Sequence, residues 1–341
     1  MRRVIALSSL LLLFLIPLSA CDTGGESDTE AAAGAMAATE PALAAIDTAD
    51  LMDYTARLSS DAFGGRSPAT PGEDSTVAFL TDRFQALGLE PGNPGGSWTQ
   101  AMTLVGIRSR ASGAIAVDDR TLPLAFPDNF VAVSYRDGEA VSVDDSEVVF
   151  VGYGVDAPEY EWDDYAGMDM TGKTLVMLVN DPPVRVAGTD SLDPGMFNGE
   201  AMTYYGRWTY KYAVGGEKGA DAVIVVHETG PAGYPWSVVT GSWGGENFDI
   251  VSEGGTEPLK VEAWITRDMA EQLFAATGHD FEAMKEAART PGFEPVSLGA
   301  TADFDIAMTR RTVDSRNVVA KLEGGTHPDE YIVYTAHWDH L

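Results

Sequence analysis

A histidine and an aspartate stand two residues apart near the end of the chain, directly after a strand-like run. The run Tyr331–Ala336 is rich in β-branched and aromatic residues and leads into His337. In open α/β sheets, functional groups gather at the carboxyl ends of strands. Residues two apart on an extended chain project to the same side, so Asp339 can accept a hydrogen bond from His337. A carboxylate that holds one ring nitrogen makes the other a better metal ligand, which predicts His337 as a metal ligand and Asp339 as its orienting carboxylate.

This spacing also fits an ordinary strand-end histidine whose ring is satisfied by a neighbouring carboxylate, and the pattern alone leaves both interpretations open. The other histidines are weaker candidates. His340 lies one residue past the aspartate and faces away from His337 and Asp339 on an extended chain, so we expect either an outer contact that supports a metal ligand or a structural role. His227 ends an apolar run and is expected to hydrogen-bond a loop, whereas His279 and His327 fall in a linker and a turn.

The composition limits which ligands and partners the chain can use. There are 22 Lys and Arg against 52 Asp and Glu, for a net charge of −30. Such a surface repels nucleic-acid phosphates, so a nucleic-acid partner is not expected. A single cysteine excludes an intramolecular disulfide framework and a cysteine-rich zinc site. Any bound metal would therefore depend on His, Asp and Glu.

The start of the chain carries the pattern of an export signal. After a basic beginning, residues 4–20 are almost entirely apolar, yet the run is short for a membrane span of about 20 residues. Leu18 is too large for an ordinary cleavage site, and with Cys21 it resembles the bacterial lipobox, in which the cysteine is lipidated. An ordinary signal peptide with a chance cysteine is the alternative. We expect a signal peptide over 1–20, a flexible tether over 21–45, and attachment to the cell envelope, facing the periplasm or exterior.

The residues between the tether and the histidine alternate helix and strand signals, which predicts an α/β fold. A first helix is expected at Asp47–Leu58. A second begins with Thr70 as N-cap, Pro71 at the first helical position and Glu73 as a capping-box residue. Gly88 is expected to end this helix.

Further helices are predicted at Tyr210–Ala220, where Gly215 and Gly216 weaken the pattern, and at Arg267–Ala276. No internal repeat is present. The apolar runs that predict strands are Glu147–Val151, Thr174–Val179, Ala222–Val226, Leu259–Ile265, Asp303–Thr309 and Asn317–Leu322.

Two blocks of sequence show a known combination of motifs. The C-terminal block consists of Ser315–Gly324 followed by Tyr331–Leu341, and the N-terminal block consists of Leu58–Asp61, Gly65-Arg66, Pro71-Gly72-Glu73 and Phe84–Pro91. Together and in this order, they resemble the co-catalytic di-zinc aminopeptidases (peptidase family M twenty-eight). The resemblance implies a zinc-exopeptidase-like fold of the phosphorylase/hydrolase-like type.

The middle of the chain resembles a protease-associated (PA) domain, which members of that family often carry as an insert. The matching segments are Phe150–Val155, Asp164-Tyr165, Gly172–Val176 and Gly216–Ile224. The resemblance implies an N-terminal part of the peptidase domain over 46–140, a β-rich α/β PA-like insert over 141–295, and the start of the catalytic domain over 296–341.

The resemblance also implies an activity. His337 would bind one of two zinc ions, Asp339 would orient it, and the substrates would be peptides that lose their N-terminal residue. In the family, the bridging aspartate, the general-base glutamate and the remaining ligands follow the His-x-Asp strand. We therefore expect an incomplete domain that is inactive as given. A non-catalytic binding protein of the envelope with the same architecture is the alternative, and nothing in the sequence indicates an oligomeric state.

Overall fold

The computed structural model describes residues 39, 41–251 and 257–340, which form two compact units divided after Asp61. The predicted signal peptide, Cys21 and most of the predicted tether lie outside the described residues. Within the described ranges, no helix has the length and apolar character needed to cross a membrane.

The helix that the sequence predicts at Asp47–Leu58 lies near the end of the first unit. Helix α2 (Thr48–Leu58) begins after Asp47, whose carboxylate accepts a hydrogen bond of 2.8 Å from the Ala49 amide. This bond satisfies one of the amides that an α-helix leaves unpaired at its start. The prediction of a helix over Asp47–Leu58 is confirmed.

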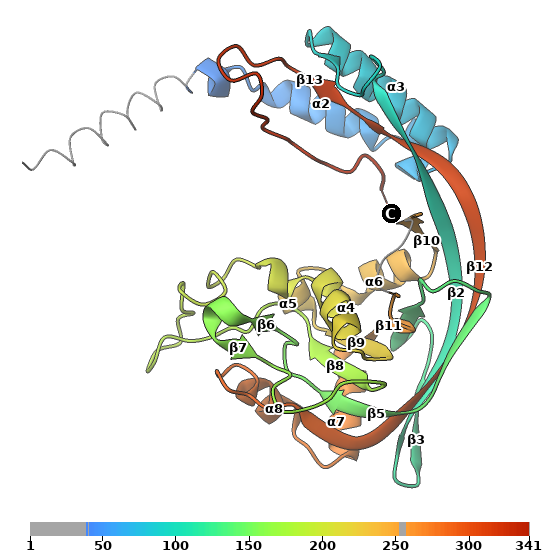
Figure 1. Cartoon of the computed structure of the whole chain (residues 1–341), viewed down its shortest axis with the longest axis vertical. Helices are drawn as coiled ribbons and strands as arrows, with labels where there is room; N and C mark the ends of the chain where they lie inside the picture. The colour runs from blue at the N-terminus through green and yellow to red at the C-terminus, as the bar shows by residue number, and fades with distance from the viewer. Residues whose placement is uncertain (1–38, 40, 252–256, 341) are drawn as a thin grey trace, which may run out of the picture. The chain divides into compact units, whose positions relative to one another are not determined.

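The second unit is mixed α/β and is built on a nine-stranded sheet (Figure 1). The strand order is β10-β2-β12-β5-β8-β9-β11-β4, and β3 pairs with β2 beside this path. The strands are β2 (Thr99–Val117), β3 (Arg120–Leu124), β4 (Phe130–Val133), β5 (Ala140–Phe150), β8 (Thr174–Leu178), β9 (Ala222–His227), β10 (Glu246–Ile250), β11 (Val261–Thr266) and β12 (Val296–Val318).

Helices cover both faces of the parallel part of this sheet, which consists of β5, β8, β9 and β11 (Figure 1). Helix α7 (Arg267–Ala276) packs on one face, where Phe274 meets Phe150 with ring centroids 5.1 Å apart. Helix α4 (Trp208–Glu217) packs on the other face, against Val223. Strands that are buried on both faces consist of continuous apolar residues. The sequence therefore predicts the parallel strands of this sheet correctly.

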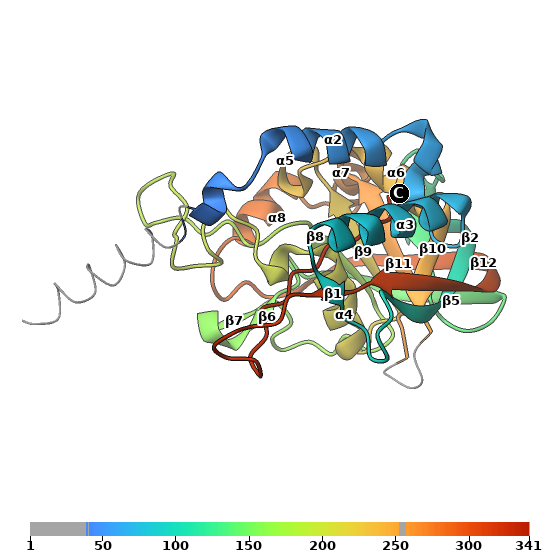
Figure 2. The same cartoon turned by 90° about the horizontal axis from the view of Figure 1, so that it is seen from above.

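The remaining elements are short, apart from α3, which lies beside one end of β12 (Figure 2). They are η1 (Asp61–Arg66), α3 (Pro71–Ala86), β1 (Glu90–Pro91), β6 (Asp156–Ala157), η2 (Pro158–Tyr160), β7 (Trp162–Asp163), η3 (Tyr204–Gly206), α5 (Thr229–Ala232), α6 (Trp236–Trp243), α8 (Phe281–Ala287) and β13 (Ala320–Lys321).

The C-terminal strands differ from the prediction. The sequence predicts separate strands at Asp303–Thr309 and Asn317–Leu322, but the first continues into the second as β12. The intervening residues are polar and break the apolar pattern, yet β2 supplies a backbone partner from Thr301 to Val318, so the ladder continues. Strands β5, β10 and β11 of the predicted insert also pair with β12, β2 and β4, which lie outside it.

The prediction of a strand at Tyr331–Ala336 is wrong. This segment has no regular secondary structure, and Tyr331, Val333 and Tyr334 are 83%, 74% and 93% exposed. A strand requires a neighbour that accepts and donates its backbone hydrogen bonds. No other strand pairs with this run within the described part of the chain.

We predict that the two adjacent glycines of α4 respond oppositely to alanine. A Cβ at Gly215 would lie 2.3 Å from Val223 Cγ2, whereas one at Gly216 would lie 3.7 Å from its nearest neighbour, Leu259. Gly215→Ala should therefore lower the free energy of unfolding by about 1–3 kcal/mol because it overpacks the interface between helix and sheet. Gly216→Ala, the control, should raise it by up to about 1 kcal/mol through helix propensity. Equal urea midpoints for the two variants would contradict this account.

Candidate functional site

The structure brings His337 and Asp339 together. Nδ1 of His337 lies 2.9 Å from the backbone oxygen of Asp339 and 3.3 Å from its carboxylate Oδ1. A proton on Nδ1 can serve either oxygen, which leaves the lone pair on Nε2. The His337 side chain is 81% exposed, so Nε2 is accessible. The predicted proximity is therefore present, while the role of His337 as a zinc ligand stays a prediction.

Trp338, between these two residues, is held at both of its polar groups. Its carbonyl accepts a hydrogen bond of 2.9 Å from Arg66 Nε, which comes from η1. Its indole Nε1 donates a hydrogen bond of 3.1 Å to the carbonyl of Arg316 on β12. Two segments distant in the sequence therefore meet at the residue that separates His337 from Asp339.

Arg316 is itself fixed by carboxylates at the start of α3. Its Nε lies 3.5 Å from Glu73 Oε1, and another guanidinium nitrogen pairs with Asp74. Glu73 is only 3% exposed, and its Oε2 accepts hydrogen bonds from the Ala69 amide at 2.6 Å and the Ser315 hydroxyl at 3.3 Å. A buried carboxylate is tolerated when donors and an opposite charge surround it, as they do here.

The local sequence explains why η1 and α3 can meet so closely. A Cβ on Gly72 would lie 2.2 Å from the carbonyl oxygen of Phe63, so only glycine fits at this crossing. The last two residues of η1, Gly65 and Arg66, have φ values of 78° and 60°, in the left-handed region. The predicted capping residue Glu73 does accept a backbone hydrogen bond, although from Ala69 rather than from the N-cap Thr70.

The described residues near His337 do not form a zinc site by themselves. A catalytic zinc ion takes about three protein ligands. No group of three or more His, Cys, Asp or Glu side chains in residues 39, 41–251 and 257–340 is arranged to hold a metal. His340 is exposed and adds no ligand to the pair. His337 and Asp339 thus supply one imidazole and one carboxylate, which do not fit a di-zinc centre alone.

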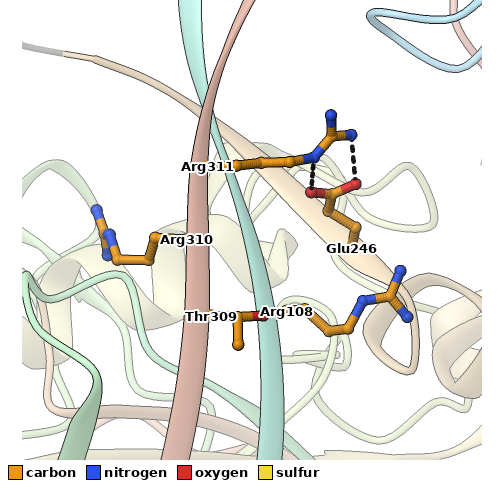
Figure 3. Close-up of a pocket in the computed structure, with 5 residues that line it drawn as sticks. All are labelled: Arg108, Glu246, Thr309, Arg310 and Arg311. Carbon is orange, nitrogen blue, oxygen red and sulfur yellow. Dashed lines mark hydrogen bonds and ion pairs between the residues drawn. The ribbon is translucent and has the colours of Figure 1, made fainter.

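A separate hollow of about 330 Å³ lies on the β2–β12 ribbon (Figure 3). Arg311 donates two hydrogen bonds, of 2.6 and 2.8 Å, to the carboxylate of Glu246, and these bonds lower the pKa of Glu246. Arg108 extends from the same face, whereas Arg310 points away to the other face (Figure 3). The hollow offers paired charges and the Thr309 hydroxyl but no histidine, so it lacks the groups for metal-assisted hydrolysis.

Several ionisable side chains are buried within the predicted insert, and the sequence did not reveal them; Lys211 and Asp164 are the most deeply buried of these. The Lys211 ammonium donates to the carbonyls of Tyr153 and Asn180, and burial lowers the pKa of this lysine. Asp164 accepts hydrogen bonds from the Trp162 indole at 2.7 Å and the Val155 amide at 2.9 Å, and burial raises its pKa. These groups join loops at the ends of β5 and β8, so we assign them to the stability of the insert.

The structure confirms that His227 hydrogen-bonds a loop. Its Nε2 lies 3.0 Å from the carbonyl of Tyr234, and its ring packs against Trp236 and Trp264 at centroid distances of 5.5 and 6.1 Å. Burial lowers the pKa of His227 below its ordinary value. Its environment is that of a structural histidine, not a metal ligand.

No protein-family model matches the chain, and no curated protein matches it. Among solved structures, a zinc aminopeptidase from Bacillus subtilis is similar, with 12% sequence identity and a TM-score of 0.28. That match covers 80% of this chain and 46% of the other. A second structure of this aminopeptidase gives 14% identity and a TM-score of 0.26, and covers 80% and 47%. The chain thus spans about half the length of the structures it matches, and likeness at this level carries no functional argument.

We predict that His227 makes stability depend on pH. Because its pKa is lower in the folded than in the unfolded protein, the unfolded state binds more protons once the pH falls below about 6.5. The free energy of unfolding should therefore be fully retained above that pH and decrease between about pH 6.5 and the lower folded-state pKa. Urea titrations should show a flatter pH dependence for His227→Gln than for the wild type. His279→Gln is the control, and identical slopes for the wild type and His227→Gln would refute the assignment.

Proposed function

We propose that this chain belongs to a metal-dependent aminopeptidase in which His337 is a zinc ligand and Asp339 orients it. One observation supports the proposal. The N-terminal and C-terminal blocks, which resemble the di-zinc aminopeptidases, contact each other around Trp338. Arg66 and Arg316 both contact Trp338, and Glu73 contacts Arg316. Unrelated segments with chance matches would have no reason to converge on the residue between His337 and Asp339.

The chain's own residues would prepare His337 for this role. The contact between Nδ1 and Asp339 keeps the ring nitrogen Nε2 available as the ligand atom. Binding a zinc pair would require further carboxylate and histidine ligands beyond those among the described residues. The aminopeptidase activity therefore belongs to the protein with its complete set of ligands.

The proposed location is the cell envelope, with the chain attached to the membrane by a lipid on Cys21 and acting on peptides. The lipobox-like residues before Cys21 support this part of the proposal. The net charge of −30 argues against nucleic acid as a partner.

A non-catalytic peptide-binding protein of the envelope is the second candidate. The observation that favours it is the lack of a three-ligand group among residues 39, 41–251 and 257–340. Such a protein would bind peptides with or without a chelator and release no amino acid. An assay of hydrolysis therefore separates the two candidates.

We predict that the protein containing this chain hydrolyses aminoacyl-nitroanilides, loses this activity with a chelator and regains it with zinc. His337→Ala should lower kcat/KM by at least about 100-fold, because loss of a ligand exceeds the usual effect of losing an outer contact. His340→Ala, three residues away and outside the His-Asp pair, is the matched control and should stay within a few-fold. Activity that survives complete metal removal would rule out the proposed mechanism.

A further inference from the structure

The segment that carries His337 has few attachments to the rest of its unit. Residues 331–340 have no regular secondary structure, and residues 331–334 are between 74% and 93% exposed. Within the described part of the chain, hydrogen bonds from this segment to other segments are confined to Trp338. The position of His337 therefore depends on how firmly Trp338 is held.

Trp338 is fixed in two directions at once. Arg66 holds its backbone carbonyl, and the carbonyl of Arg316 holds its indole nitrogen. One contact fixes the path of the main chain, and the other fixes the side-chain rotamer. Because a residue anchored at both ends has little freedom to rotate, the residues before and after it acquire defined directions.

The two anchors are themselves rigid. Arg66 follows a turn of positive φ that packs against α3 where Gly72 allows close approach. Arg316 lies on the long β12 strand and pairs with the buried Glu73, which also accepts hydrogen bonds from two other groups. A well-satisfied buried carboxylate is a stable reference point, because any movement would leave its charge unpaired.

We propose that Trp338 is a positioning residue and that Arg66, Glu73, Arg316 and Trp338, here called the Trp338 clamp, fix the main chain between His337 and Asp339 before any metal binds. The relevance of the clamp to catalysis rests on the proposed function, but its existence does not. Preorganised ligand residues lose less conformational freedom when they bind their ligand. The clamp thus gives one physical role to motif residues that lie far from His337 in the sequence.

The clamp can be tested by nuclear magnetic resonance on the whole chain labelled with ¹⁵N in tryptophan and histidine. Arg66→Met removes the hydrogen bond to the Trp338 carbonyl and keeps most of the side-chain stem. Freeing the Trp338 carbonyl should weaken the indole's own hydrogen bond to Arg316. We expect the Trp338 indole proton to exchange with solvent about fivefold faster or more, which corresponds to the free energy of one typical hydrogen bond. The ¹⁵N relaxation of the His337 amide should show increased fast motion. Glu73→Gln removes the charge that faces the Arg316 guanidinium, and it should produce both changes to a smaller extent because Trp338 binds the backbone carbonyl of Arg316.

Arg120→Met is the matched control, because Arg120 also donates to a backbone carbonyl, that of Ala276 at 2.9 Å, on a different part of the unit. This variant should leave the Trp338 and His337 signals unchanged. The urea midpoint provides a second readout. In Arg66→Met it should stay near the wild-type value, because residues 331–340 bury little surface. Changed Trp338 and His337 signals with an unchanged urea midpoint would show that Arg66 positions Trp338 and does not act through the stability of the fold.

The clamp is refuted if the Trp338 indole and the His337 amide keep wild-type behaviour in both Arg66→Met and Glu73→Gln. It is also refuted if these signals change only in proportion to a global loss of stability, as the urea midpoint would show. If they change as expected while no aminopeptidase activity is found, the clamp stands and the proposed function fails. The two hypotheses therefore have distinguishable outcomes.

Discussion

The antiparallel ladder between β2 and β12 is the interaction on which the rest of the second unit depends. It runs without a break from Thr301 opposite Ala116 to Val318 opposite Thr99. Along β12, Ile306 is buried toward the core, whereas Ser315, which is out of phase with it, is buried toward α3. Since alternate residues of a strand face opposite sides, one register serves both packing surfaces, and a slip of one residue would disrupt both.

The ladder also explains how an acidic protein supports buried charge near its candidate site. Strand β12 places Arg316 next to Glu73 and Asp74. The other half of this strand is held in the core, where Phe304 stacks on Phe130 with ring centroids 6.0 Å apart. The positive partner of the Glu73 carboxylate therefore lies on a strand and is not a mobile side chain or a solvent ion. Such fixed pairing makes a buried ionic group compatible with stability, because the desolvation of each charge is offset by a partner already in place.

Much of the fold could be predicted because local signals agree with the final packing. Helix α7 begins and ends where its pattern predicts, at Arg267 and Ala276, and the parallel strands are continuous apolar runs. The sequence could not predict β12 through its polar middle, since only the partner strand makes that segment extended. The His337–Asp339 pair was predicted from spacing. The anchoring of Trp338 was not, because Arg66 lies 272 residues away and contacts at that distance leave no local pattern.

The exposed run Tyr331–Tyr334 has a consequence for how the chain behaves in solution. Its side chains are β-branched or aromatic, and its backbone pairs with no strand among the described residues, so another extended segment can add to it. The net charge of −30 opposes this by mutual repulsion between molecules. That repulsion is screened beyond about 10 Å at 0.1 M salt, whereas the attraction between apolar strands is not. Ionic strength, more than protein concentration alone, should therefore govern whether this chain stays monodisperse during purification.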